Sequence, residues 1–118
     1  MLDEATPFPA GQDAIWMSQF LSCFGAPSIA SILRRAAASL APGGHVHILD
    51  TFWDRQEHPA AAFSLQAISL YFTCLANGHS RMYKASDITA MLEAAGLEVE
   101  STSDILGVCS SLLVCRKR

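Results

Sequence analysis

The run AIWMSQFLSCFGAPSIASILRRAAASLAPGGHVHILDTF, residues 14–52, decides the fold, because it contains an apolar strand, a helix and a second apolar strand. Its first eight residues form the continuous apolar run typical of a strand covered on both faces. Pro27 suits the first turn of a helix, whose apolar residues then recur at helical spacing. Pro42-Gly43-Gly44 stops that helix before a second buried strand, residues 46–52. This order predicts parallel strands joined by a crossover helix.

The downstream sequence adds two helices and two strands. A helix over residues 60–76 closes at Asn77-Gly78, and a third helix starts near Ser86, a candidate N-cap. LEVEST and SSLLVCRKR then read as strands. The fold class expected is α/β, a doubly wound and mostly parallel sheet of four strands. Because the helix over residues 60–76 is apolar nearly all round, we expect it to be buried, and it is only a weak membrane-span candidate.

Composition narrows the function classes. The chain has 118 residues, of which 51% are hydrophobic and 16% charged, so it carries more apolar surface than one small core hides. We therefore expect an oligomer or a missing further part. The net charge of -3 without a basic stripe argues against a nucleic-acid partner. Four cysteines without a CxxC motif, and no visible signal peptide, indicate the cytoplasm and no membrane partner.

Three segments carry a resemblance to a known family. They are FPAGQDAIWMSQFLSCFG, ILRRAAASLAPGGHVHILDTFWD and ANGHSRMYKASDITAMLEAAGLEV, at residues 8–25, 32–54 and 76–99. In this order and spacing they resemble the C-terminal half of the S-adenosylmethionine-dependent O-methyltransferases of the plant caffeate type and their bacterial relatives. LAPGG matches the family's helix-to-strand junction. A fragment of another Rossmann-like enzyme, such as a dehydrogenase, is the alternative.

The resemblance implies a fold and a missing part. The fold is the C-terminal half of a Rossmann-like class I methyltransferase, with four strands, mostly parallel, and the last strand antiparallel. The family's N-terminal dimerisation domain and glycine-rich cofactor loop are absent from this chain. The full-length protein is therefore expected to be a homodimer that uses S-adenosyl-L-methionine as methyl donor. Without the glycine-rich loop, the isolated chain should bind this donor poorly.

The resemblance also assigns three catalytic positions. The family turn is often L-H-D-W, whose histidine takes the proton of the acceptor hydroxyl, and here it is Leu21-Ser22-Cys23-Phe24. Asp50 and Ser80 match two glutamates that steer this histidine. Serine without a base is a poor proton acceptor. Asp50 either accepts a proton, directly or through water, or merely caps the turn after its strand.

Other positions are assigned on the same resemblance. Asp3, Glu4 and Ser18 match donor-binding positions, although a solvated acidic terminus and an ordinary strand-end serine are the alternatives. Tyr71 and Met82 are expected to line the acceptor pocket, where core packing is the alternative. Side chains of other types carry weaker signals: Cys23 reads as a small buried thiol rather than a nucleophile, and the pair His45 and His47 is too sparse to predict a metal site.

Two functions remain open from the sequence. The first is methyl transfer to a small, aromatic, hydroxylated metabolite, driven mainly by proximity and orientation. A phenol, with a pKa of about 10, loses its proton more readily than an alcohol and so needs less help from a base. The second is a catalytically silent homologue that serves as a binding or regulatory partner, which the missing histidine and glutamate motivate.

Overall fold

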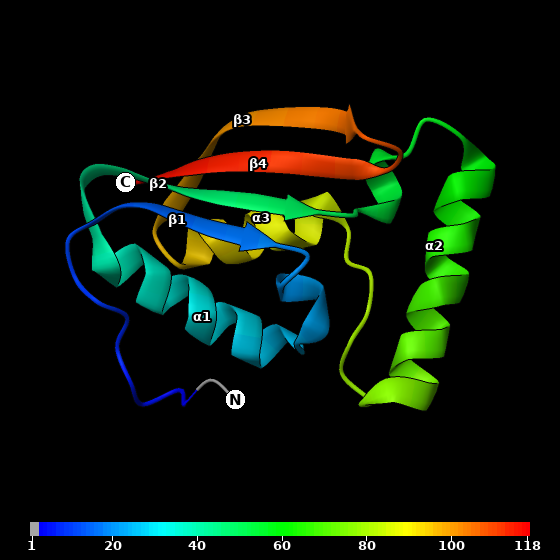
Figure 1. The fold of residues 1–118 in the computed structure, drawn as a ribbon, viewed down its shortest axis with the longest axis horizontal. Helices are drawn as coiled ribbons and strands as arrows, with labels where there is room; N and C mark the ends of the chain where they lie inside the picture. Colours follow the sequence, from blue (N-terminus) through cyan, green and yellow to red (C-terminus); the bar gives the residue numbers. More distant parts are fainter. Residues whose placement is uncertain (1–2) are drawn as a thin grey trace.

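The computed structural model describes residues 3–118, which form one four-stranded sheet with two helices, α1 and α3, on the same side of it (Figure 1). A further helix, α2, stands apart from the end of the sheet. In chain order the elements are β1 (Gln12–Ser18), a 3-10 turn (Leu21–Cys23), α1 (Ala26–Ser39), β2 (Leu40–Asp50), a 3-10 turn (Trp53–Arg55), α2 (Pro59–Tyr71), a π-helical turn (Phe72–Ala76), α3 (Ala85–Ala94), β3 (Leu97–Leu106) and β4 (Ser110–Lys117).

The strand order in the sheet is β1-β2-β4-β3. β1 pairs with β2 in parallel, whereas β4 lies antiparallel to both of its neighbours, β2 and β3. Three strands therefore point the same way and the last strand opposes them. This confirms the predicted α/β class and the antiparallel final strand. The doubly wound arrangement is wrong for residues 3–118, because α1 and α3 lie on the same side of the sheet (Figure 1).

The core lies between the sheet and helices α1 and α3. The apolar face predicted for α1 is the face that the helix buries, since Ile29, Ile32 and Leu33 are at most 2% exposed. α3 contributes Ile88 and Leu92 to the same cluster. Burial also raises the pKa of the Cys115 thiol on β4 to about 12, so this sulfur remains protonated and chemically inert.

The opposite face of the sheet is open among the described residues. Trp16 on β1 is 58% exposed and stacks on His47 of β2, with ring centroids 5.7 Å apart. On the same face, Nε2 of His45 lies 3.1 Å from Oε2 of Glu100. The prediction that the first two strands are covered on both faces is therefore wrong, because α1 and α3 both pack on one side.

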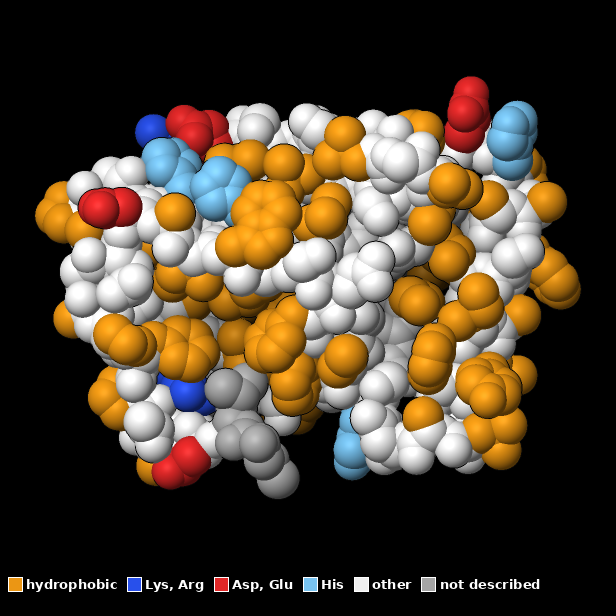
Figure 2. Space-filling view, viewed as in Figure 1, with side chains coloured by type: hydrophobic (Ala, Val, Ile, Leu, Met, Phe, Trp, Pro, Cys, Tyr) orange, Lys and Arg blue, Asp and Glu red, His pale blue; other side chains and the backbone are white. Residues whose placement is uncertain are grey.

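Helix α2 also departs from the prediction. Leu65 is its only buried residue, while Phe63, Leu70 and Tyr71 are 73%, 66% and 59% exposed. The expectation of a buried helix is wrong for residues 3–118, because α2 touches the remainder of the domain along a single side. By length and composition, the 18 residues Pro59–Ala76 are long and apolar enough to cross a membrane. Figure 2 shows apolar side chains gathered over this helix, at the right of the view.

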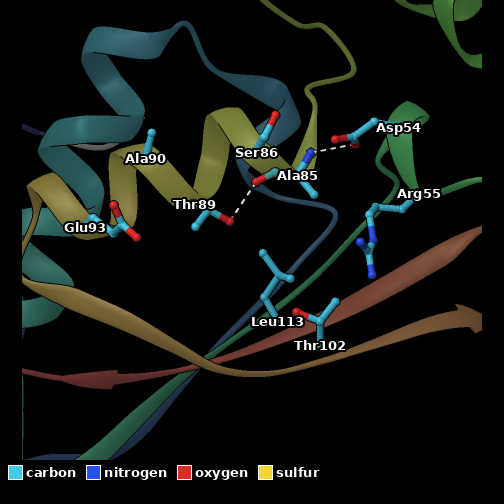
Figure 3. A pocket seen from close by; sticks show the side chains of 9 residues that line it. All are labelled: Asp54, Arg55, Ala85, Ser86, Thr89, Ala90, Glu93, Thr102 and Leu113. Atoms are coloured by element: carbon cyan, nitrogen blue, oxygen red, sulfur yellow. Dashed lines mark hydrogen bonds between the residues drawn. The ribbon is translucent and has the colours of Figure 1, made fainter.

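The N-cap of α3 lies two residues before the predicted one. Lys84 is the N-cap, and Ser86 lies inside the first turn without capping it. The side chain of Asp54 takes that role from a distant turn, where its Oδ1 accepts the N–H of Ala85 at 2.7 Å (Figure 3). A carboxylate there also interacts favourably with the N-terminal end of the helix dipole.

Gly44 lies where β1 and β2 come together. β2 begins at Leu40, so Pro42-Gly43-Gly44 lies inside this strand, at an irregularity of the register. A Cβ on Gly44 would lie only 2.7 Å from the carbonyl oxygen of Gln12. The absence of a side chain at this position is therefore what lets the two strands meet.

Replacing Gly44 with alanine is expected to destabilise the fold by about 1–3 kcal/mol, since the clash is with backbone that cannot rotate away. Urea denaturation would measure this loss. Gly25→Ala is the comparison without a clash, because a Cβ there meets nothing closer than Pro27 Cδ at 3.9 Å. Gly25 is the N-cap of α1, so this variant is expected to lose only the capping preference, about 0.5–1 kcal/mol. An equal loss in the two variants would contradict the steric explanation.

Candidate active site

The turn that follows β1 exposes Ser22 at the C-terminal edge of the parallel strands. β1 ends at Ser18, and Gln19 then adopts a left-handed backbone with φ of 46°. Its N–H donates to the carbonyl of Leu49 on β2 at 2.7 Å, which fixes the chain where it leaves the sheet. A non-glycine residue in this conformation stores strain, and such strain concentrates at functional sites.

Asp50 lies behind this turn, at the end of β2. Its side chain is 4% exposed, and its Oδ2 accepts the N–H of Ser22 at 3.4 Å while Oδ1 accepts the N–H of Thr51 at 2.9 Å. Burial raises the pKa of the Asp50 carboxyl, and the hydrogen bonds from Thr51 and from the N–H and hydroxyl of Ser22 offset part of that rise. Asp50 is thus a buried carboxylate that is held against Ser22.

Three hydrogen bonds hold the loop after α2 against the same turn. Ser80 Oγ donates to the carbonyl of Cys23 at 3.4 Å. The N–H of Arg81 donates to the carbonyl of Ser22 at 3.0 Å, and the hydroxyl of Tyr83 donates to the carbonyl of Phe24 at 2.7 Å. We call these three bonds the clasp. Every carbonyl from residue 22 to residue 24 accepts one of them, so the clasp fixes the position of the Ser22 backbone.

Asn77 shapes the loop that carries the clasp. Its Oδ1 accepts the N–H groups of His79 and Ser80 at 2.8 and 2.7 Å, and its Nδ2 donates to Ser80 Oγ at 2.8 Å. α2 and the π-helical turn after it add two further bonds: Ser69 of α2 accepts the N–H of Met82, and Thr73 of the π-helical turn donates to the carbonyl of Ser80. The polar residues that interrupt the apolar sequence of α2 therefore anchor this helix to the loop.

A cavity of about 240 Å³ opens between the turn, the loop and the π-helical turn. Its polar wall includes Ser22 and Ser80, and its apolar wall includes Phe72 and Met82. Asp50 does not line it. A separate narrow crevice, bordered by Ser22 and Asp50, has no room for a water molecule. Ser22 therefore stands between the cavity and the buried carboxylate.

The structure brings together four of the eight residues predicted from the sequence. Ser22, Ser80 and Met82 line the cavity, and Asp50 lies directly behind Ser22. Tyr71 is largely exposed and does not line it, although its ring packs edge-on against Phe72, with centroids 5.7 Å apart.

The three predicted donor-binding residues lie outside this cavity. Asp3 accepts hydrogen bonds from Ala5 and Thr6 at 3.0 and 2.9 Å, and these bonds lower the pKa of its carboxyl. Glu4 accepts a hydrogen bond from Ser28 at the start of α1, at 3.4 Å. Ser18 is exposed at the end of β1. Their predicted role in donor binding stays a prediction.

Gln19 and Asn77 were not predicted as site residues. Gln19 lines the cavity, but in the sequence it is one polar residue inside an apolar run. Asn77 was recognised only as a helix terminator, although an Asn-Gly pair after a helix is also a common place for side-chain hydrogen bonds to the backbone. Cys23 is exposed and lines the cavity, so its interpretation as a buried thiol is wrong.

A larger cavity, of about 360 Å³, lies between α3 and the sheet (Figure 3). Two of its three charged groups have partners: Arg55 pairs with Asp104, and Asp54 caps α3, whereas the third, Glu93, is an exposed carboxylate. Among residues 3–118, no group of three or more histidine, cysteine, aspartate or glutamate side chains is arranged to hold a metal ion. The Ser22 cavity is therefore the better candidate for chemistry.

Comparison with known proteins identifies the family. The family model described as a methyltransferase domain matches residues 3–102. The chain superposes on TnmH with a TM-score of 0.82 at 24% identity, and on the mitomycin 7-O-methyltransferase MmcR with 0.79 at 22%; each match covers 98% of this chain. The O-methyltransferase NcsB1, in complex with S-adenosylmethionine and 2-hydroxy-5-methyl naphthoic acid, gives 0.75 at 21% over 96%.

The chain spans about a third of the length of these structures, covering 33%, 32% and 31% of TnmH, MmcR and NcsB1. No curated protein matches it. Its sheet and helices correspond to the C-terminal part of a Rossmann-like methyltransferase. Because the family model covers most of the sequence, the chain belongs to the methyltransferase-domain family.

Proposed function

We propose that this chain forms the acceptor side of an S-adenosyl-L-methionine-dependent O-methyltransferase. One observation carries the proposal: Ser22 stands between a cavity of about 240 Å³ and the buried carboxylate of Asp50. Crevices at the carboxyl ends of strands are the usual ligand sites of open α/β sheets. Membership of the methyltransferase-domain family supplies the reaction class.

The acceptor is a small aromatic compound that carries a hydroxyl group. Phe72 and Met82 provide an apolar wall for a ring, while Ser22 and Ser80 provide polar contacts for a hydroxyl. The naphthoic acid in the NcsB1 structure is a compound of this chemical class. A phenolic hydroxyl also suits a site that lacks a histidine base, since it ionises more readily than an aliphatic one.

Ser22 and Asp50 would move the proton of the acceptor. The donor supplies an electrophilic methyl group on a sulfonium, so the O–CH₃ bond forms as the S–CH₃ bond breaks and sulfur keeps the electron pair. The phenolic proton passes to Ser22 Oγ while the Ser22 proton passes to Asp50. The crevice excludes water, so the route to Asp50 runs through this hydroxyl. A raised carboxyl pKa makes Asp50 a stronger base.

Orientation supplies most of the rate in this proposal. The clasp and the left-handed Gln19 fix the turn, so an acceptor bound against Ser22 is held in one direction. Holding two reactants in an attack geometry contributes on the order of 7–11 kcal/mol in favourable cases. Proton transfer through Ser22 then needs to supply only part of the remaining barrier reduction.

A silent homologue is the second candidate, because Ser80 is committed to the clasp rather than to a base. Its Oγ donates to Cys23 and accepts from Asn77. In that case the cavity would bind a ligand without turnover. Such a protein would bind phenols and the donor, yet it would form no methyl ether.

Turnover by the full-length protein separates the two candidates. The assay supplies S-adenosylmethionine with a labelled methyl group and matched panels of phenols and aliphatic alcohols. We expect methyl ether and S-adenosylhomocysteine in equal amounts, with phenols preferred. Donor breakdown without a methylated acceptor, or no turnover with any phenol, would reject the methyltransferase function. A Ser22→His variant tests the silent alternative, since it places a base beside Asp50.

A further inference from the structure

Among the described residues, the wall of the Ser22 cavity has one charged member, Arg81. The backbone of Arg81 belongs to the clasp, but within residues 3–118 its guanidinium forms neither an ion pair nor a hydrogen bond. The side-chain amide of Gln19, in the same wall, likewise forms no hydrogen bond with the described part of the chain. The proposed methyl transfer uses neither side chain. Both are therefore available as donors to a ligand in the cavity.

Tyr83 supports the guanidinium of Arg81. Cζ of Arg81 lies over the Tyr83 ring, 4.5 Å from its centroid, a distance at which cation–π attraction acts. The ring is buried, and its hydroxyl donates to the carbonyl of Phe24 at 2.7 Å, so the guanidinium lies on a fixed surface. A guanidinium that stacks by its face keeps the N–H groups at its edge free. These paired N–H groups match the two oxygens of a carboxylate.

The segments that form the cavity provide no acidic partner for Arg81. Residues 14–49 and 58–86 contain every residue of the cavity wall and no aspartate or glutamate. Asp50 follows the first segment directly, but it is 4% exposed, lies behind Ser22 and does not line the cavity. The wall therefore carries a net positive charge, which favours an anionic ligand.

We propose that Arg81 determines acceptor specificity by binding a carboxylate, so that the acceptor is a hydroxyaryl carboxylic acid. This inference rests on the proposed function, which places the acceptor hydroxyl at Ser22. The N–H of Arg81 donates to the carbonyl of Ser22 at 3.0 Å, so the two side chains leave neighbouring points of the backbone. A ring against Phe72 and Met82 then presents its hydroxyl to Ser22 and its carboxylate to Arg81. Two polar contacts fix the direction of the ring, whereas the hydroxyl contact alone leaves it free to turn.

Matched acceptors test the role of the carboxylate. The ortho-, meta- and para-hydroxybenzoic acids are each compared with the corresponding carboxamide, which keeps the shape and lacks the charge. Affinities are measured by calorimetric titration of the full-length protein with S-adenosylhomocysteine present, so that no methyl group is transferred. We expect at least one acid to bind roughly 10- to 100-fold more tightly than its amide, the range expected for hydrogen bonds to a charged group.

Variants of Arg81 assign this preference to its side chain. Arg81→Gln should abolish the preference and leave the affinity for the amide unchanged. Arg81→Lys keeps the charge but loses the paired N–H groups, so it should give an intermediate preference. Arg34→Gln is the matched control, because Arg34 is an exposed arginine on α1 that does not line the cavity, and it should bind like the wild type. The clasp uses the backbone of Arg81, so Arg81→Gln should keep its far-UV circular dichroism and urea midpoint.

Three binding results would overturn the inference. The first is equal affinity for acid and amide with every isomer, and the second is a preference that Arg81→Gln leaves intact. The third is an Arg81→Gln variant that loses affinity for acid and amide alike, because this would indicate that Arg81 pairs with another part of the full-length protein and shapes the cavity indirectly.

Turnover then separates this inference from the proposed function. With the preferred acid, we expect the methyl ether and no methyl ester, because the carboxylate is held at Arg81 and the hydroxyl at Ser22. A methyl ester would overturn the assignment of Arg81. A preference for the acid without any methylated product would reject the methyltransferase function and leave that assignment in place. Equal kcat/KM for acid and amide would have the reverse meaning.

Discussion

Asp50→Asn is expected to lower kcat for methyl transfer by about 100-fold or more, the typical contribution of a general base. Asparagine keeps the size of the side chain and one oxygen, which can accept the N–H of Thr51 as Oδ1 does now at 2.9 Å. Its NH₂ group replaces Oδ2, so the longer bond from the Ser22 N–H at 3.4 Å is lost together with the capacity to take a proton, while acceptor binding and KM should change little. Ser22→Ala should lower kcat as well, because it removes the hydroxyl that connects the cavity with Asp50.

The pH profile provides a signature of this role. The relay needs the Asp50 carboxylate, so kcat should rise with pH through the raised pKa of Asp50 and then level off. Asp50→Asn should show no such rise. Glu93→Gln is the matched control, since Glu93 is an exposed carboxylate on α3 that lines the other cavity. A kcat for Asp50→Asn within about twofold of the wild type would exclude the relay.

Stability should change with pH in the opposite direction. Because folding raises the pKa of Asp50 above its usual 3.8, the folded state favours the protonated carboxyl. This contribution is fully present below pH 3.8 and is lost as the pH rises through the raised pKa. The difference in unfolding free energy between Asp50→Asn and the wild type should therefore shift in favour of the variant as the pH rises. Urea titrations across this range would measure it.

Tyr83→Ala is expected to cost about 3–5 kcal/mol of unfolding free energy, the usual loss for truncating a buried aromatic residue. Tyr83 is 3% exposed, belongs to the core cluster and donates its hydroxyl to Phe24 at 2.7 Å. The loss is a large fraction of the 5–15 kcal/mol that typically separates folded from unfolded proteins. It combines a cavity in the core with the loss of one bond of the clasp.

Tyr83→Phe separates these two contributions. Phenylalanine fills the same space and leaves only the Phe24 carbonyl unpaired, so we expect a loss of about 1–3 kcal/mol. Urea denaturation of both variants gives the comparison. If the two variants lost the same amount, the hydrogen bond rather than packing would dominate. If Tyr83→Ala lost under about 1 kcal/mol, the clasp would not hold the turn.

The sequence predicted elements well where one local signal decided them. Proline at the start of α1 and the spacing of Ile29, Ile32 and Leu33 were sufficient for that helix and for its buried face. The antiparallel final strand followed from the family resemblance rather than from its own residues. Burial of α2 was mispredicted, because an all-round apolar pattern shows that a helix needs a partner without showing which chain provides it.

In the candidate site, too, residues with a local signal were predicted, and residues that act through distant partners were not. Ser22 and Asp50 were found because they follow strands at known positions, but their contact joins residues 28 positions apart. Asn77 and Tyr83 were missed as parts of the site because their importance lies in the carbonyls and amides they bond to. Because almost every residue has the same backbone N–H and C=O groups, the sequence does not indicate which of them a side chain will bond to, and the clasp could be recognised only from the structure.

The order β1-β2-β4-β3 has a consequence for how the chain assembles during synthesis. β3 pairs with β4 alone, so residues 97–106 have no strand to join until residues 110–117 have left the ribosome. One edge of β2 pairs with β1, but its other edge must wait for β4, where Arg116 is the partner of His45, which lies 71 positions earlier. Until then its apolar edge is open to other chains. Synthesis is therefore expected to leave this edge exposed until residues 110–117 have emerged and β4 has inserted between β2 and β3.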